Sequence, residues 1–170
     1  MATFDYPYMA AGRKRPDPLP KLIDAHRAAI ESIPRKGASP LVLMGKSMGS
    51  RVGCHVATEN DDVARSVHAL VCFGYPLRGQ SGKLRDEVLR ELRIPILFVQ
   101  GTRDALCPLD ALTKVRRRMR AKTELHVVED GDHSLRVAKR TLAKTNETQA
   151  DVDARSLEAV RNFLEGALDA

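Results

Sequence analysis

The chain has 170 residues, of which 43% are hydrophobic and 29% charged, and it carries a formal net charge of +6. This composition is that of an ordinary globular protein, and it excludes a disordered or repetitive chain. The longest apolar runs, at 69–73 and 94–99, are far shorter than the roughly 20 residues that cross a membrane. We therefore expect a single domain over residues 1–170 and no membrane partner.

Short apolar runs alternate with longer amphipathic stretches, which is typical of a mostly parallel sheet flanked by helices. The predicted fold class is therefore α/β. The run at 96–100 is almost continuously apolar, as expected for a strand buried on both faces. In chain order the sequence predicts strand 3–8, helix 21–33, strand 41–44, a helix from 50 to about 59, strand 69–73, helix 84–92, strand 96–100, helix 109–119, strand 124–128, a polar loop at 144–149 and helix 152–168.

Residues 45–49, with the sequence Gly-Lys-Ser-Met-Gly, lie between an apolar run and a predicted helix. The pattern Gly-x-Ser-x-Gly in this setting is typical of a nucleophile elbow, a strained turn that exposes the serine hydroxyl above a helix N-terminus. Small residues on both flanks allow the strand and the helix to approach each other. The alternative is a tight strand-to-helix turn that happens to contain a serine. We interpret Ser47 as a nucleophile.

Two later strands are followed by an acid and a histidine, Asp104 after strand 96–100 and His133 after strand 124–128. Loops at the carboxyl ends of parallel strands meet at one edge of the sheet, so we expect both side chains near Ser47. The order serine, acid, histidine is that of the α/β-hydrolase fold. In this interpretation His133 accepts and returns the serine proton, and Asp104 orients His133.

These assignments have structural alternatives. Asp104 could serve only as a turn residue, and His133 could be a surface loop histidine. Asp110 is a less suitable acid because it falls at the start of the next predicted helix. Cys107 is a less suitable nucleophile, because nothing in the nearby sequence would lower the pKa of its thiol.

Three further residues belong to the predicted site. Met48 directly follows the serine, so its backbone N–H would stabilise the oxyanion. Tyr75 and Leu77, after strand 69–73, would lie at the rim of a substrate pocket. The alternative for this pair is a place in the hydrophobic core.

The cysteines and the basic clusters bear on location and partners. Cys54, Cys72 and Cys107 are odd in number and widely spaced, which fits reduced thiols in a cytoplasmic or nuclear protein. Basic residues cluster at 13–15 and 116–122. Because no stacking aromatic run, zinc-finger spacing or recognition helix accompanies them, we interpret them as solvated faces and do not expect nucleic acid binding.

Several motifs together resemble a known family, the α/β-hydrolase-like proteins that include the testis-expressed hydrolase-like protein and a subunit of the NSL histone acetyltransferase complex. The resemblance extends over nearly the whole chain. It implies a dienelactone-hydrolase-like fold and a serine triad at Ser47, Asp104 and His133. The motifs that carry it are Phe-Asp-Tyr-Pro-Tyr-Met at 4–9, Gly-Arg-Lys-Arg-Pro at 12–16, the elbow at 45–49, Gly-Tyr-Pro-Leu at 74–77, Phe-Val-Gln-Gly-Thr-Arg-Asp at 98–104 and Gly-Asp-His-Ser at 131–134.

The same resemblance implies a difference at the N-terminal end. Members of the family have an additional strand and a His-Gly-rich loop before the segment equivalent to residues 4–8, and this chain begins after them. That strand would lie between strand 3–8 and strand 41–44, and its loop would supply a second oxyanion N–H. We therefore expect a sheet that lacks the N-terminal strands and an oxyanion site with one fewer donor.

From these observations we expect a serine hydrolase of esterase type that acts on a small-molecule acyl or ester substrate, with no cofactor and no metal ion. The alternative is a catalytically silent protein of the same fold that binds a protein partner.

Overall fold

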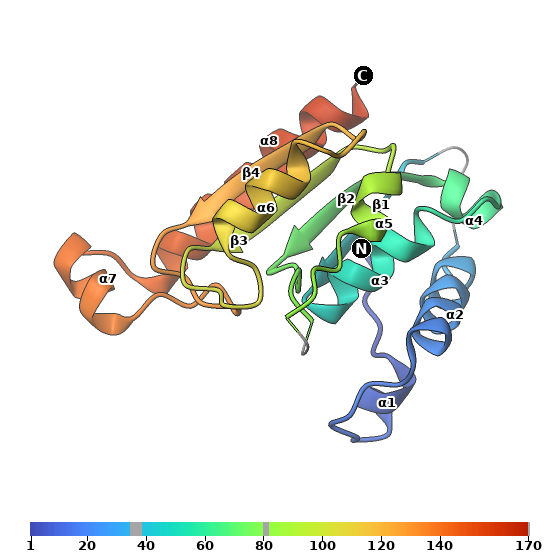
Figure 1. Cartoon of the computed structure of the whole chain (residues 1–170), viewed down its shortest axis with the longest axis horizontal. Coiled ribbons are helices and arrows are strands. Elements are labelled where there is room, and N and C mark those ends of the chain that lie inside the picture. The colour runs from blue at the N-terminus through green and yellow to red at the C-terminus, as the bar shows by residue number, and fades with distance from the viewer. Residues whose placement is uncertain (35–38, 80–81, 170) are drawn as a thin grey trace.

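The computed structural model describes residues 1–34, 39–79 and 82–169. Its centre is a parallel sheet of four strands in the spatial order β1-β2-β3-β4 (Figure 1). The fold class is therefore α/β, as predicted. The strands are β1 (Leu41–Lys46), β2 (Val67–Phe73), β3 (Ile96–Gly101) and β4 (Thr123–Val128), and the helices are α1 (Pro7–Ala10), α2 (Leu19–Glu31), α3 (Met48–Val56), α4 (Asp62–Arg65), α5 (Glu87–Glu91), α6 (Leu109–Arg116), α7 (Lys139–Thr145) and α8 (Gln149–Leu168).

Two hydrophobic clusters lie on the two faces of the sheet. Residues alternate between the faces along each strand, so Leu70 and Phe98 pack on one side while Val71 and Val99 pack on the other. The first face is covered by α2, α3, α5 and α6, and the second by α8 (Figure 1). Every residue of β3 is buried, in agreement with its continuous apolar sequence.

The strand registers bring the carboxyl ends of the four strands level with one another. Lys46 at the end of β1 is opposite Phe73 of β2, which is opposite Val99 of β3. Gly101 at the end of β3 is opposite Val128 of β4. The loops that follow these strands therefore emerge at the same end of the sheet, as the sequence pattern predicted.

The predicted strand at 3–8 is wrong, because the structure has no strand there and α1 begins at Pro7. Proline fixes φ near the helical value and suits the first turn of a helix. Tyr6 instead anchors the segment: its side chain is buried, and its hydroxyl forms a hydrogen bond with Nδ1 of His26 on α2 over 3.1 Å. The ring of Phe4 packs edge-on against the rings of Tyr6 and His26.

The remaining differences concern helix ends and short helices. The predicted helix 84–92 is shorter, since α5 spans only Glu87–Glu91. The predicted polar loop at 144–149 contains the end of α7, which has no buried residue and so no hydrophobic periodicity. At Thr148 a capping box with Asp151 starts α8 at Gln149, earlier than predicted.

Within the part of the chain that the structure describes, no helix combines the length and the hydropathy that crossing a membrane requires. β1 pairs with β2 alone among the described residues, so it forms one edge of the sheet.

Candidate active site

Ser47 lies between the end of β1 and the start of α3 with φ 53° and ψ −116°. A non-glycine residue rarely adopts a positive φ, and such strain persists only where the surroundings hold it. Here the Ser47 N–H donates to the carbonyl oxygen of Phe73 over 2.9 Å, and its own carbonyl accepts from Arg51 N–H. This is the backbone conformation that a nucleophile elbow requires.

The two glycines of the motif have different roles. A Cβ atom on Gly45 would lie 2.4 Å from the backbone carbon of Gly49 and 2.4 Å from the backbone nitrogen of Ser50. The Ser50 hydroxyl also donates to the Gly45 carbonyl over 2.6 Å, which holds strand and helix together. A Cβ on Gly49 would meet no atom within 4 Å. Only Gly45 is therefore required by the close approach of β1 and α3.

The structure brings Ser47, His133 and Asp104 together in one hydrogen-bonded set. The Ser47 hydroxyl lies 2.8 Å from His133 Nε2, and His133 Nδ1 lies 2.8 Å from Asp104 Oδ2. With the histidine proton on Nδ1, the serine hydroxyl donates to Nε2 and Nδ1–H donates to the carboxylate. The Asp104 side chain is completely buried, whereas that of His133 is 29% exposed. The imidazole can therefore be reached from solvent and the carboxylate cannot.

Asp104 is held by two donors in addition to His133. Gln100, the fifth residue of β3, donates from Nε2 to Asp104 Oδ2 over 2.6 Å, and Leu106 N–H donates to Oδ1 over 2.8 Å. Gln100 also accepts from Tyr75 N–H over 3.1 Å and is fully buried. The sequence analysis missed Gln100. The signal that could have found it is a glutamine within the most apolar strand, because a buried amide needs partners.

The loop that carries His133 packs against two glycines, Gly74 directly after β2 and Gly101 at the end of β3. A Cβ on Gly74, which has φ 56°, would lie 2.6 Å from the His133 carbonyl oxygen, and one on Gly101 would lie 2.2 Å from the Gly131 carbonyl oxygen. Asp132 shapes the same loop by accepting from the N–H groups of Ser134 and Arg136. The N–H of Arg136 is the largest cause that lowers the pKa of the Asp132 carboxyl, and the N–H of Ser134 lowers it further.

Met48 is the first residue of α3, so its N–H has no partner within the helix and lies beside Ser47. The structure contradicts the predicted pocket rim. Tyr75 and Leu77 are both fully buried in the core cluster between the sheet and its helices. The Tyr75 ring packs edge-on against Phe98, and its hydroxyl donates to the Arg85 carbonyl. Their side chains have no surface with which to contact a substrate, because their size and apolar character suit the core.

The two alternatives weighed from the sequence lie away from this set. Asp110 is in the first turn of α6, where its carboxylate faces Lys114 at 3.8 Å. Cys107 is fully buried, and burial together with the nearby Asp104 raises the pKa of its thiol to about 12. A thiol with so high a pKa is a poor nucleophile.

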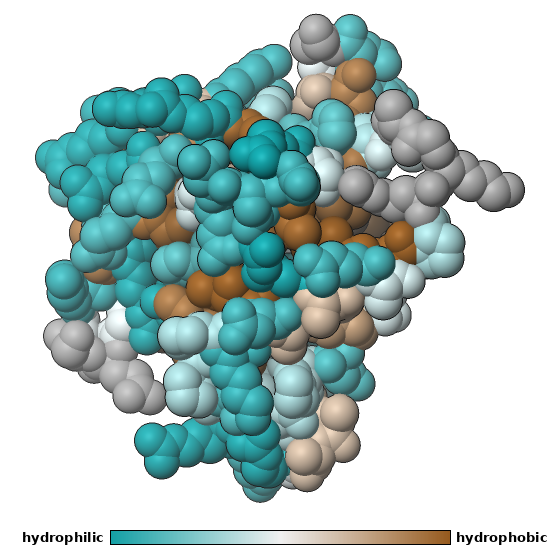
Figure 2. Space-filling model, turned by 90° about the vertical axis from the view of Figure 1, so that its right-hand side faces the viewer, coloured by the Kyte–Doolittle hydropathy of each residue, from teal (hydrophilic) through white to brown (hydrophobic). Residues whose placement is uncertain are grey.

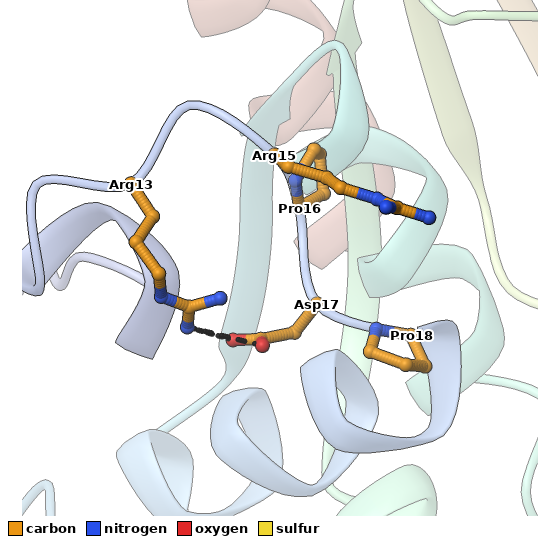
Figure 3. A pocket seen from close by; sticks show the side chains of 5 residues that line it. All are labelled: Arg13, Arg15, Pro16, Asp17 and Pro18. Carbon is orange, nitrogen blue, oxygen red and sulfur yellow. Dashed lines mark hydrogen bonds and ion pairs between the residues drawn. The ribbon is translucent and has the colours of Figure 1, made fainter.

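Two surface hollows of the described residues are lined by residues outside the Ser47 set. One of about 340 Å³ is lined by Arg13, Arg15 and residues 16–18. In Figure 3 the Arg13 guanidinium points to the Asp17 carboxylate, at 3.0 Å, while Arg15 extends away from it. No group of three or more His, Cys, Asp or Glu side chains among residues 1–34, 39–79 and 82–169 is arranged to hold a metal ion.

A family model described as an α/β-hydrolase domain matches residues 1–165. Because the match covers almost the whole sequence, the chain belongs to this family. Its four parallel strands, flanked by helices, are those of the α/β-hydrolase fold, which the sequence predicted.

Solved structures support the same fold. An α/β serine hydrolase homologue from Coxiella burnetii has a TM-score of 0.56 at 18% identity, over 72% of this chain and 55% of that one. A serine hydrolase involved in carbazole degradation has a TM-score of 0.62 at 16% identity, over 89% and 74%. An esterase of Pyrococcus furiosus has a TM-score of 0.61 at 15% identity, over 88% and 62%. The chain thus spans little more than half of the Coxiella protein.

Proposed function

We propose that the protein is a serine hydrolase of esterase type that works through an acyl-enzyme. The observation that carries the proposal is the position of His133, which lies 2.8 Å from the Ser47 hydroxyl on one side and 2.8 Å from the Asp104 carboxylate on the other. A serine alone is a weak nucleophile at neutral pH, and it needs such a base within hydrogen-bond distance.

In the first half-reaction, Ser47 Oγ attacks the carbonyl carbon of the substrate and His133 Nε2 takes the hydroxyl proton. The imidazolium that forms is stabilised by Asp104, which is buried and keeps the proton on Nδ1. His133 then gives its proton to the leaving alcohol as the tetrahedral intermediate collapses. In the second half-reaction, water loses a proton to His133 and attacks the acyl-enzyme. The C–Oγ bond then breaks, His133 returns the proton to Ser47 Oγ, and the acid is released.

Charge on the carbonyl oxygen develops beside the N-terminus of α3. The Met48 N–H is the donor that we assign to it, because it follows Ser47 directly and has no intrahelical acceptor. One oxyanion donor of this kind typically contributes about 10²- to 10³-fold to turnover. The esterase and serine hydrolase names of the structural neighbours agree with an ester substrate.

The test is labelling by a fluorophosphonate probe, followed by turnover of short-chain nitrophenyl esters. Ser47→Ala should abolish both, whereas the matched control Ser134→Ala should keep both, because Ser134 is exposed and only its N–H is hydrogen-bonded in this loop. Equal labelling of the two variants would contradict the assignment of Ser47.

A second candidate function is a silent hydrolase-fold module that binds a protein partner. The observation that favours it is the edge strand β1, which pairs on one side only among the described residues and exposes 49% of Met44. Figure 2 views the molecule from the side on which β1 is the outermost strand, and hydrophobic side chains gather in its middle. An edge with free N–H and C=O groups can accept a further strand. Ser47-dependent turnover would exclude a purely silent module.

A further inference from the structure

Two buried side-chain nitrogens on α3 have no hydrogen-bond partner among the described residues, Arg51 Nε and His55 Nε2. Buried polar atoms are paired in the great majority of cases, so each exception calls for a physical explanation. The mechanism above uses neither residue. Leaving a buried donor unsatisfied costs free energy, which a bound acceptor would recover.

The two nitrogens belong to the same face of α3. Arg51 and His55 are four residues apart, a spacing that sets side chains one above the other on a helix. α5 lies beside this helix in Figure 1 and packs on it. A third basic group, Arg85, precedes α5 and is close enough to Arg51 to oppose its charge. We call Arg51, His55 and Arg85 the α3–α5 basic cluster.

The charges of this cluster are not compensated within the described residues. Neither Arg51 nor Arg85 forms an ion pair there, although six other arginines do: Arg13, Arg27, Arg65, Arg90, Arg155 and Arg161. Burial and the charge of Arg85 lower the pKa of Arg51, and burial followed by the charge of Arg51 lowers the pKa of His55. Burial is the larger cause in both cases, and the like charge of a neighbouring arginine adds to it.

The acidic side chains nearest to the cluster are Glu87 and Glu91 of α5. Both residues are exposed, and neither accepts a hydrogen bond from Arg51 or His55 within the described part of the chain. Glu87 faces Lys83 instead, at 3.4 Å. The Tyr75 hydroxyl donates to the carbonyl oxygen of Arg85, and within the described residues it accepts no hydrogen bond from either guanidinium. A negatively charged acceptor is what the cluster lacks.

We propose that the α3–α5 basic cluster is a binding site for a phosphate-type oxyanion, either free phosphate or a phosphate monoester. Two guanidinium groups match the nearly double negative charge of such a group, and they donate in pairs to its oxygens. Arg51 Nε–H and the Nε2–H tautomer of His55 supply further donors from the same face. A water molecule could satisfy single donors, but it would leave the two positive charges opposed. The three side chains of this cluster are not members of the Ser47 set, and the site does not depend on the proposed hydrolase activity.

The experiment is a titration of the whole chain with sodium phosphate, followed by thermal unfolding and by calorimetry, against sodium chloride at equal ionic strength. At a hundredfold excess over Kd, phosphate should raise Tm by roughly 5–10 °C beyond chloride. Arg51→Met and Arg85→Met should each weaken binding by about 10- to 100-fold. Arg117→Met removes the same charge from an exposed position on another element and should leave Kd unchanged.

Three outcomes of the titration itself would overturn the proposal. They are a phosphate effect no larger than that of chloride, an effect that both cluster variants retain, and an effect that sodium acetate reproduces in full, which would assign the site to a carboxylate. If Arg51→Met does not fold, Arg85→Met and His55→Phe test the same cluster from another element and from the next helical turn. Phosphate binding should also persist in Ser47→Ala, and its loss there would place the anion at the oxyanion site instead. Failure of the hydrolase assay leaves these results unaffected.

Discussion

Replacing Gly45 by alanine should damage the protein far more than replacing Gly49, although both glycines belong to the same motif. The new Cβ of Gly45→Ala would lie 2.4 Å from backbone atoms of Gly49 and Ser50. Ordinary contacts between carbon atoms lie at about 3.5–4.0 Å, so the overlap is about 1 Å. Because the atoms involved are backbone, rotation of a side chain cannot relieve it. Strand β1 or helix α3 must move.

The free energy of unfolding should therefore fall by about 3 kcal/mol or more, at or beyond the upper end of typical overpacking costs. For a chain of this size that loss lowers Tm by roughly 6–12 °C. Gly49→Ala has open space around its Cβ and lies in the first turn of α3. Alanine favours the helix by about 0.5–1 kcal/mol over glycine, so this variant should be neutral or slightly more stable.

Urea unfolding of both variants beside the parent chain gives the comparison, with ester turnover as a second measurement of the elbow geometry. Gly45→Ala should lose turnover even where it remains folded, because moving α3 moves Ser47 and the Met48 N–H with it. The reasoning would be refuted if the two variants lost equal stability, or if Gly45→Ala stayed within about 1 kcal/mol of the parent.

Three further predictions follow from buried groups. Gln100→Leu should lower kcat and destabilise the protein by about 1–3 kcal/mol, because it removes a donor from buried Asp104; an unchanged kcat would show that the amide does not position the acid. Burial lowers the pKa of His26 from 6.5 to about 4, so the unfolded chain binds the proton more readily and stability should fall by on the order of 3 kcal/mol as the pH drops from 6.5 to 4. His26→Gln should flatten that urea-midpoint profile, and an equally steep profile would assign the loss to other groups. All three thiols are buried, and burial raises the pKa of Cys54 and Cys107, so all three should resist DTNB in the native protein and react after unfolding. If the native protein reacted with DTNB as fast as the unfolded chain, the burial of the thiols would be contradicted.

The central part of the site could be predicted from the sequence because parallel strands bring their carboxyl ends to one edge. Ser47, Asp104 and His133 each follow a strand, so the α/β class places them at the same end of the sheet. Because β1 and β4 are the outer strands, His133 reaches Ser47 only because the loop after β4 crosses the ends of β3 and β2. Gln100 could not be found in the same way. It lies inside β3 and belongs to no motif, and its role depends on which loop packs over it.

The errors have a common physical cause, which is that local patterns do not report tertiary contacts. Segment 3–8 has strand-like residues, yet Pro7 starts a helical turn and the Tyr6 side chain packs against α2. Tyr75 and Leu77 follow a strand end, as site residues do, but the chain folds their side chains back into the core. No residue of helix α7 is fully buried, so its sequence lacks the hydrophobic periodicity from which a helix could be predicted.

The spacing of the Ser47 set along the chain has a consequence for folding. The Ser47 to His133 hydrogen bond joins residues 86 positions apart, and the His133 to Asp104 bond joins residues 29 apart. Contacts between distant residues form late, because closing long loops costs entropy before the contact contributes stability. Catalytic competence should therefore return only after all four strands have paired. During refolding, the regain of turnover should lag behind the return of helical signal, so activity measures the last step of assembly.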